Sequence, residues 1–145
     1  MIVEVTGSAV PRLTRRDVTT FVRKVLLALQ KDEEITNVSI AFIDDEAMKN
    51  LNRKFRHKNK TTDVLTFPAD DSYNEPKLRG RPLGDIVISV DQARRQARDE
   101  KHSLATEVWF LLLHGVLHAL GYDHEMDNGE MNATELRVRQ AVGLA

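Results

Sequence analysis

Three of the five histidines lie within eleven residues, from His114 to His124. His114 and His118 are four residues apart, so on a helix both imidazole rings point from one face, about one turn apart. Gly121 permits the positive φ that turns a chain back after a helix, so His124 can approach the same point from the far side. Because neutral imidazole is a preferred ligand of Zn²⁺, the spacing predicts that His114, His118 and His124 bind one zinc ion per chain.

The residues around these histidines indicate an open, catalytic zinc site. A structural zinc site is closed by four protein ligands, whereas a catalytic site keeps one position for water. The chain has no cysteine, and Asp123 and Glu125 are the only neighbouring carboxylates that could close the site. We therefore expect a zinc ion that lowers the pKa of its bound water to about 7. The other two histidines, His57 and His102, are interpreted as having no part in this site.

The histidine spacing also matches the extended zinc-protease pattern H-E-x-x-H-x-x-G-x-x-H. In that pattern the glutamate after the first histidine is the general base, and here this position is Gly115. A glycine cannot accept a proton, so the sequence argues against a protease mechanism.

A run of basic residues is the second feature that could do chemistry. Five cations and no acid lie within eight residues: Arg53, Lys54, Arg56, Lys58 and Lys60. By itself such a run is typical of a solvated helix end whose cations complement the helix dipole. Alternatively, a guanidinium can form two hydrogen bonds to one phosphate while neighbouring cations hold the flanking backbone.

Length and composition indicate the class of protein that carries these residues. The chain has 145 residues, 41% of them apolar, so we expect one domain over residues 1–145 with its own core. A net charge of -1 argues against a uniformly basic nucleic-acid binder. No apolar stretch approaches the roughly 18 residues of a membrane helix, and residues 1–5 carry no leader pattern. We therefore expect a soluble cytoplasmic protein.

Hydrophobic periodicity predicts the elements that must position these residues. Strands are expected at residues 2–6, 37–42, 64–67 and 85–88, with a loop over 69–82. Helices are expected to begin after Thr14, Asp44, Ser89 and Ser103 as N-caps, with a last helix at about 131–142. The helix over 104–120 is apolar nearly all round, so we expect it at the centre of the fold, ended by Gly121.

The order of these elements predicts the fold class. The connection from residue 67 to residue 85 contains no helix, so a purely alternating doubly wound sheet does not fit. We predict an α+β fold in which a mixed four-stranded sheet, with one antiparallel pair, is packed with about five helices. The central apolar helix would carry the metal ligands.

Three blocks of the sequence resemble the YbeY family of bacterial rRNA-maturation endoribonucleases. Residues 114–124 resemble its H-G-x-L-H-x-x-G-Y-D-H signature, with Ala119 where leucine is usual. Residues 51–56 and 62–68 resemble its L-N-x-x-[YF]-R and T-[DN]-V-L-[ST]-F-P blocks. Residues 83–88 resemble its L-G-D-I-x-I strand.

The resemblance implies a zinc-dependent endoribonuclease that prefers single-stranded RNA. It implies maturation of the 3′ end of small-subunit ribosomal RNA and a part in ribosome quality control, with the small ribosomal subunit and assembly factors, including GTPases, as partners. It also implies an α+β fold with a mixed four-stranded sheet, a zinc at the base of a groove, and an important role for the arginine at position 56.

Together, the histidine cluster and the resemblance favour RNA binding by the basic run. We expect Arg56 to stabilise charge on the phosphoryl group, and Arg53, Lys54, Lys58 and Lys60 to bind the flanking backbone. Asp123 is a further catalytic candidate, either as a base or as the group that orients a ligand histidine, and Glu125 is its neighbour. Asp85, at a strand start, is interpreted as structural.

Two other functions remain open on the sequence. One is a metal hydrolase acting on another substrate, such as a peptide. The other is a ribosome-assembly protein in which zinc braces the fold and the basic face binds RNA without cutting it.

Overall fold

The computed structural model describes residues 1–69, 80–123 and 126–144. In these ranges the chain forms four strands: β1 (Ile2–Gly7), β2 (Ile35–Ile43), β3 (Val64–Pro68) and β4 (Arg81–Ser89). The same ranges contain five helices: α1 (Arg15–Ala28), α2 (Asp45–Arg56), α3 (Val90–Asp99), α4 (Leu104–Ala119) and α5 (Glu130–Val142). Within them, no helix is long and apolar enough to cross a membrane.

The strands form one mixed sheet in the order β1-β2-β4-β3. The pairs β1/β2 and β2/β4 are parallel, whereas β3 and β4 are antiparallel. The predicted α+β fold with one antiparallel pair is therefore confirmed.

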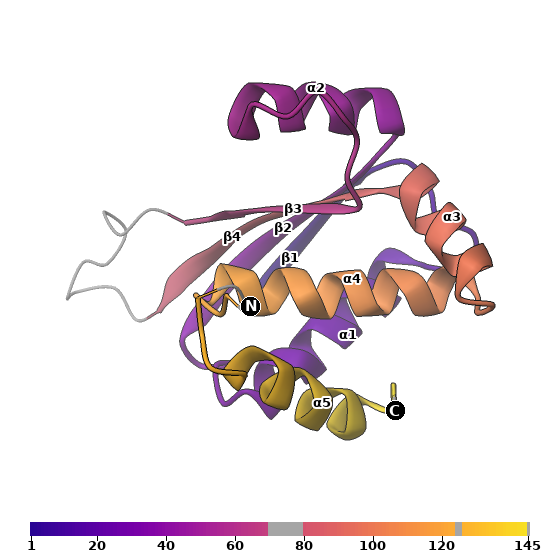
Figure 1. Ribbon diagram of the computed structural model, residues 1–145. Helices are drawn as coiled ribbons and strands as arrows, with labels where there is room; N and C mark the ends of the chain where they lie inside the picture. Colours follow the sequence, from indigo (N-terminus) through magenta and orange to yellow (C-terminus); the bar gives the residue numbers. More distant parts are fainter. Residues whose placement is uncertain (70–79, 124–125, 145) are drawn as a thin grey trace.

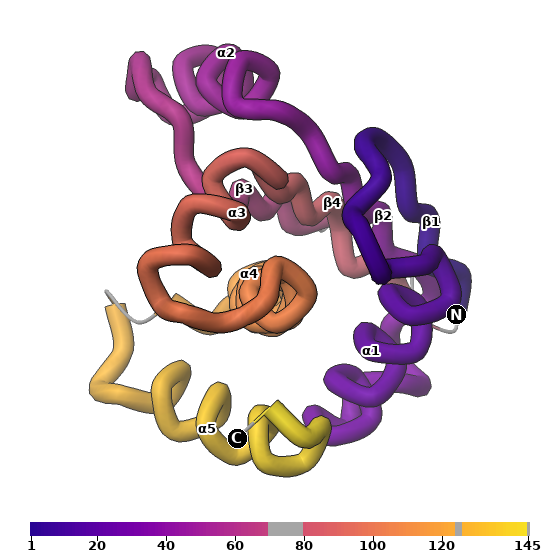
Figure 2. Tube along the Cα trace, turned by 90° about the vertical axis from the view of Figure 1, so that its right-hand side faces the viewer, coloured from indigo at the N-terminus to yellow at the C-terminus, as the bar shows by residue number. Residues whose placement is uncertain are grey.

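The helices cover the two faces of the sheet unequally. Helix α2 lies on one side, and α1, α4 and α5 lie on the other (Figure 1). Figure 2 looks along α4 and shows α1, α3 and α5 arranged around it, with the sheet on the remaining side. Leu112, Leu113, Val116 and Leu117 of α4 are fully buried, so apolar packing fixes the helix along its length.

Local signals in the sequence set the helix ends. The four predicted N-caps are confirmed. Thr14 forms a capping box with Asp17, and the side chains of Asp44, Ser89 and Ser103 accept from backbone N–H groups of the helices that follow them. At the end of α4, the N–H groups of Gly121 and Tyr122 donate to the carbonyls of His118 and Leu117. Gly121 has φ 101°, so this Schellman motif ends the helix where the sequence predicts.

Strand β4 starts earlier than its sequence indicates. The expected strand began at Asp85, but β4 begins at Arg81, inside the segment expected to be a loop. Pro82 pairs with Asn37 where the register with β2 shifts, and Gly84 has φ 128°. A Cβ on Gly84 would lie 2.2 Å from the Phe67 carbonyl oxygen. Proline and glycine, which favour turns in isolation, here accommodate an irregular strand.

Asp85 consequently lies within the strand, paired with Phe67, and the expectation that it starts the strand is wrong.

Candidate active site

A polar pocket brings together segments that are far apart in the sequence. Its volume is about 380 Å³. Its lining residues come from the end of α2, from β3 and the loop before it, and from α4 and the turn after it: Arg56, Thr62, Asp63, Val64, Thr66, Pro68, His114, His118 and Asp123. Two predicted metal ligands and both predicted catalytic residues therefore share one pocket.

The two histidines of α4 form a close pair at the pocket wall. Their ring centroids are 4.4 Å apart, with 66° between the ring planes. Both side chains are partly buried, whereas the three residues between them are buried. The i, i+4 spacing thus places both rings on the face of α4 that lines the pocket, which agrees with the expectation that they share one face.

The chemistry of this pair fits a metal such as Zn²⁺. Neutral imidazole nitrogen is a preferred ligand of Zn²⁺, and the two rings lie next to each other in the same pocket. The third predicted ligand, His124, and its neighbour Glu125 lie outside the described residues. Among the described residues, no cluster of three histidine, cysteine or acidic side chains is arranged to hold a metal.

Arg56 reaches the pocket because α2 ends there. It is the last residue of α2, and His57 caps the helix end in a left-handed conformation with φ 58°. The other four members of the basic run are exposed and are not among the lining residues: Arg53, Lys54, Lys58 and Lys60. The run therefore divides into one pocket residue and four cations on the surface beside it.

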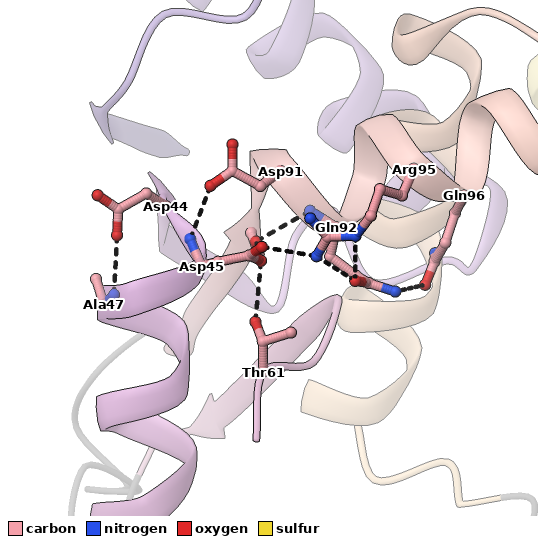
Figure 3. Close-up of polar contacts among 9 residues, drawn as sticks. Asp44, Asp45, Ala47, Thr61, Asp91, Gln92, Arg95 and Gln96 are labelled. Carbon is pink, nitrogen blue, oxygen red and sulfur yellow. Dashed lines mark hydrogen bonds and ion pairs between the residues drawn. The ribbon is translucent and has the colours of Figure 1, made fainter. Parts of the chain in front are cut away.

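Hydrogen bonds tie the loop between α2 and β3 to the body of the protein. The Asp45 carboxylate accepts hydrogen bonds from Ser89 at 2.9 Å and Thr61 at 3.1 Å, and it pairs with Arg95 at 2.7 Å (Figure 3). Asn52 donates to the carbonyl of Lys60 at 2.8 Å. These contacts fix both ends of α2, and with them the approach of Arg56 to the pocket.

Asp45 is also the titratable group most clearly perturbed near this loop. Partial burial raises the pKa of its carboxyl, but the hydrogen bonds from Arg95, Ser89 and Thr61 together outweigh burial. The pKa of Asp45 therefore lies below its usual value, and the carboxylate stays charged at neutral pH.

Asp63 is a pocket residue that the sequence analysis does not single out. One carboxylate oxygen accepts from the N–H of Val64 at 2.7 Å, and the other accepts from the side chain of Gln96 at 3.3 Å. A signal for it exists in the sequence, because it directly precedes β3 within the T-D-V-L-T-F-P block. The contact with Gln96, which comes from α3, has no such signal.

The remaining candidates lie as follows. Asp123 lines the pocket two residues beyond Gly121, at the turn after α4. Asp85 is exposed and lines a separate apolar pocket between α2 and the sheet, together with Phe55 and Phe67. His102 lies 2.7 Å from the carboxylate of Glu107, and neither residue lines the polar pocket.

Comparison with known proteins identifies what this chain is similar to. A family model described as Endoribonuclease YbeY matches residues 6–143. The endoribonuclease YbeY of Nautilia profundicola is 46% identical over 108 residues, which cover 74% of this chain and 73% of the relative. The endoribonuclease YbeY of a Sulfurovum species is 42% identical over 120 residues, covering 81% of this chain and 82% of the relative.

A solved structure has the same fold. It is the solution structure of TM1509 from Thermotoga maritima, with a TM-score of 0.64 and 23% sequence identity. The match covers 97% of this chain and 89% of that chain.

Proposed function

The chain belongs to the YbeY family of endoribonucleases, and on this premise we propose that it cleaves single-stranded RNA with the help of one bound Zn²⁺. The observation that carries the proposal is the pocket in which Arg56 from α2 lies together with His114 and His118 from α4. The pocket thus holds a guanidinium that can bind phosphate, and beside it two imidazoles that can bind a metal. This combination suits the cleavage of a phosphodiester bond. We assign this activity to the domain over residues 1–145.

His114, His118 and His124 would hold the zinc ion. When bound, zinc lowers the pKa of a coordinated water and stabilises negative charge on a phosphoryl oxygen. The guanidinium of Arg56 would form two hydrogen bonds to the phosphate and stabilise charge that develops there. Asp123 would orient a ligand histidine or accept a proton, since it lines the same pocket.

The exposed cations beside the pocket would bind the flanking RNA. Arg53 and Lys54 lie on the last turn of α2, and Lys58 and Lys60 lie in the loop after it, so all four cations are near Arg56 along the chain and exposed. Contacts of this kind hold phosphates without reading the bases. They favour RNA over a peptide as substrate, because a peptide offers no repeating anionic backbone.

The biological substrate in this proposal is ribosomal RNA. From the family resemblance, we infer processing of the 3′ end of small-subunit rRNA and a part in ribosome quality control. The partners would be the small ribosomal subunit and its assembly factors, and the activity would take place in the cytoplasm.

Cleavage of a labelled single-stranded RNA tests the proposal. The wild-type protein is compared with His118→Ala and Arg56→Ala, each purified identically to control for contaminating nucleases. Lys24→Ala is the matched control, because Lys24 is exposed on α1 and does not line the pocket. We expect cleavage by the wild type and Lys24→Ala, and its loss in the other two variants. Equal cleavage by all four proteins would contradict the proposal.

A second candidate is an RNA-binding assembly protein in which zinc only braces the fold. Its affinity for RNA would depend on its exposed cations, and it would cleave no RNA. An absence of cleavage by a wild-type protein that binds the RNA would favour this alternative.

A further inference from the structure

The Asp63 carboxylate is held firmly at the pocket wall. The backbone N–H of Val64 donates to one oxygen at 2.7 Å, and the side-chain amide of Gln96 donates to the other at 3.3 Å. The backbone carbonyl of Asp63 accepts from the N–H of Ser89 at 2.9 Å. The Thr62 hydroxyl also donates to the oxygen that accepts from Val64, at 3.5 Å. Because a carboxylate has about four acceptor sites, these contacts fix its direction and leave acceptor capacity for a group in the pocket.

Gln96 is in turn held by a polar network behind the pocket. Its amide nitrogen donates to the carboxylate of Glu107 at 3.0 Å, and its amide oxygen accepts from Gln92 at 3.1 Å. Glu107 is 7% exposed, and its second oxygen lies 2.7 Å from His102. A buried carboxylate therefore determines which way the Gln96 amide points, and that amide orients Asp63.

A carboxylate at this position cannot bind the phosphate itself. Asp63 lines the same pocket as Arg56, where the proposed substrate places a phosphodiester group. Two anions in contact repel each other, so a substrate group that contacts Asp63 has to be a hydrogen-bond donor. In the RNA backbone the donor next to each phosphate is the ribose 2′-hydroxyl, which DNA lacks.

We propose that Asp63 accepts a hydrogen bond from the ribose 2′-hydroxyl beside the phosphate bound by Arg56, and that this contact makes the pocket select RNA over DNA. The inference rests on the proposed function and adds a specificity-determining residue to it. Gln96 is then a positioning residue, because it acts on the substrate through Asp63.

Binding measured before cleavage tests the inference. Stopped-flow fluorescence anisotropy of the full-length wild-type protein is recorded with three single-stranded oligonucleotides of matched sequence: RNA, DNA and 2′-fluoro RNA. The 2′-fluoro sugar removes the donor but stays RNA-like in shape. We expect RNA to bind about tenfold more tightly than either of the others, the scale of one hydrogen bond to a charged group.

Substitutions then assign that preference to one side chain. In Asp63→Ala we expect the preference for RNA to fall to about twofold or less, whereas DNA binds as well as before or better, because a negative charge has left the pocket. Asp63→Asn keeps one acceptor oxygen but loses the charge, so it should retain only part of the preference. Asp32→Ala is the matched control, since Asp32 is exposed and lies outside the pocket.

The outcomes separate this inference from the proposed function. Equal binding of RNA, DNA and 2′-fluoro RNA by the wild type overturns the inference, and this comparison does not depend on any variant folding. An unchanged preference in a folded Asp63→Ala variant also overturns it, while RNA cleavage by the wild type still supports the proposed function. A wild type that binds neither nucleic acid contradicts both.

Discussion

Gly115 of α4 packs directly against the side chain of Ile86 on β4. A Cβ placed on Gly115 would lie 2.7 Å from Ile86 Cγ2, closer than real Cβ contacts come, and Ile86 is fully buried. The position that holds the general base in zinc proteases is thus in this fold a point where the helix touches the sheet. A side chain there would force Ile86 or α4, with the histidines it carries, to shift.

Gly115→Ala should therefore destabilise the protein, although alanine is the better helix former. Replacing glycine gains up to about 1 kcal/mol of helix propensity, whereas overpacking a core costs about 1–3 kcal/mol. We expect a net loss of about 1 kcal/mol in the free energy of unfolding, measured by urea denaturation. In an Ile86→Ala background the same substitution should be neutral or stabilising, because the clashing methyl group is gone. Additive effects in this double-mutant cycle would show that the contact does not limit the packing.

Metal removal should abolish cleavage and leave the protein folded. Helix α4 is held by fully buried residues such as Leu113 and Leu117, and the two histidines are only partly buried at the pocket wall. After treatment with a chelator we expect unchanged far-UV circular dichroism, a Tm lowered by only a few degrees, and activity that returns when zinc is added. Cooperative unfolding on chelation would instead identify a metal that braces the fold.

Arg56→Lys should reduce the rate of cleavage more than the binding of RNA. Lysine keeps the positive charge but cannot form the paired hydrogen bonds of a guanidinium. We expect kcat to fall by roughly 10- to 100-fold, with little change in the salt dependence of binding. Steady-state kinetics at several salt concentrations separates the two effects. A large rise in KM at constant kcat would mean that Arg56 binds the substrate and its transition state equally.

Lys58→Ala and Lys60→Ala should show the opposite behaviour. Both lysines are exposed in the loop after α2 and lie outside the pocket lining, so they would contact phosphates that flank the cleaved bond. Each substitution should weaken RNA binding at low salt and lower the slope of log K against log salt by about 1. Cleavage at saturating RNA should be nearly unchanged. If the salt slope is unaffected, these cations do not contact the RNA backbone.

Asp45→Asn should destabilise the protein at neutral pH and have little effect in acid. Since the pKa of Asp45 is lowered on folding from 3.8, its charge contributes stability in full above about pH 4 and progressively less as the pH falls through the folded-state pKa. The side chain is 33% exposed, so we expect a loss of only about 1 kcal/mol at pH 7. Denaturant unfolding at pH 7 and at a series of falling pH values below 4 measures how the loss shrinks. A loss that stays the same across the series would show that the charge is not responsible.

Local features of this chain could be predicted from its sequence. The capping residues Thr14, Asp44, Ser89 and Ser103 and the helix stop at Gly121 all act within a few residues, so their effect follows from neighbouring atoms. The i, i+4 geometry of His114 and His118 is equally local. The expectation that these rings share one face therefore agrees with the structure.

Contacts between distant segments depended on strand order and register, which no local signal specifies. The early start of β4 at Arg81 depends on pairing with β2, whereas the proline and glycine in this segment predicted a loop. Asp63 is a pocket residue fixed by Gln96 from α3, and that contact exists only once α3 packs against α4 and β4.

By itself the sequence determined the elements, the helix ends and the chemistry of the histidine pair, because each depends on backbone geometry over a few residues. Only the tertiary structure decided that Arg56 and Asp63 meet those histidines in one pocket, and that Gly115 is there for packing against Ile86. The physical reason is that burial of α4 fixes how α3 and the sheet pack around it, while the buried Met48 of α2 packs with Leu65 and Val87 on the opposite face of the sheet.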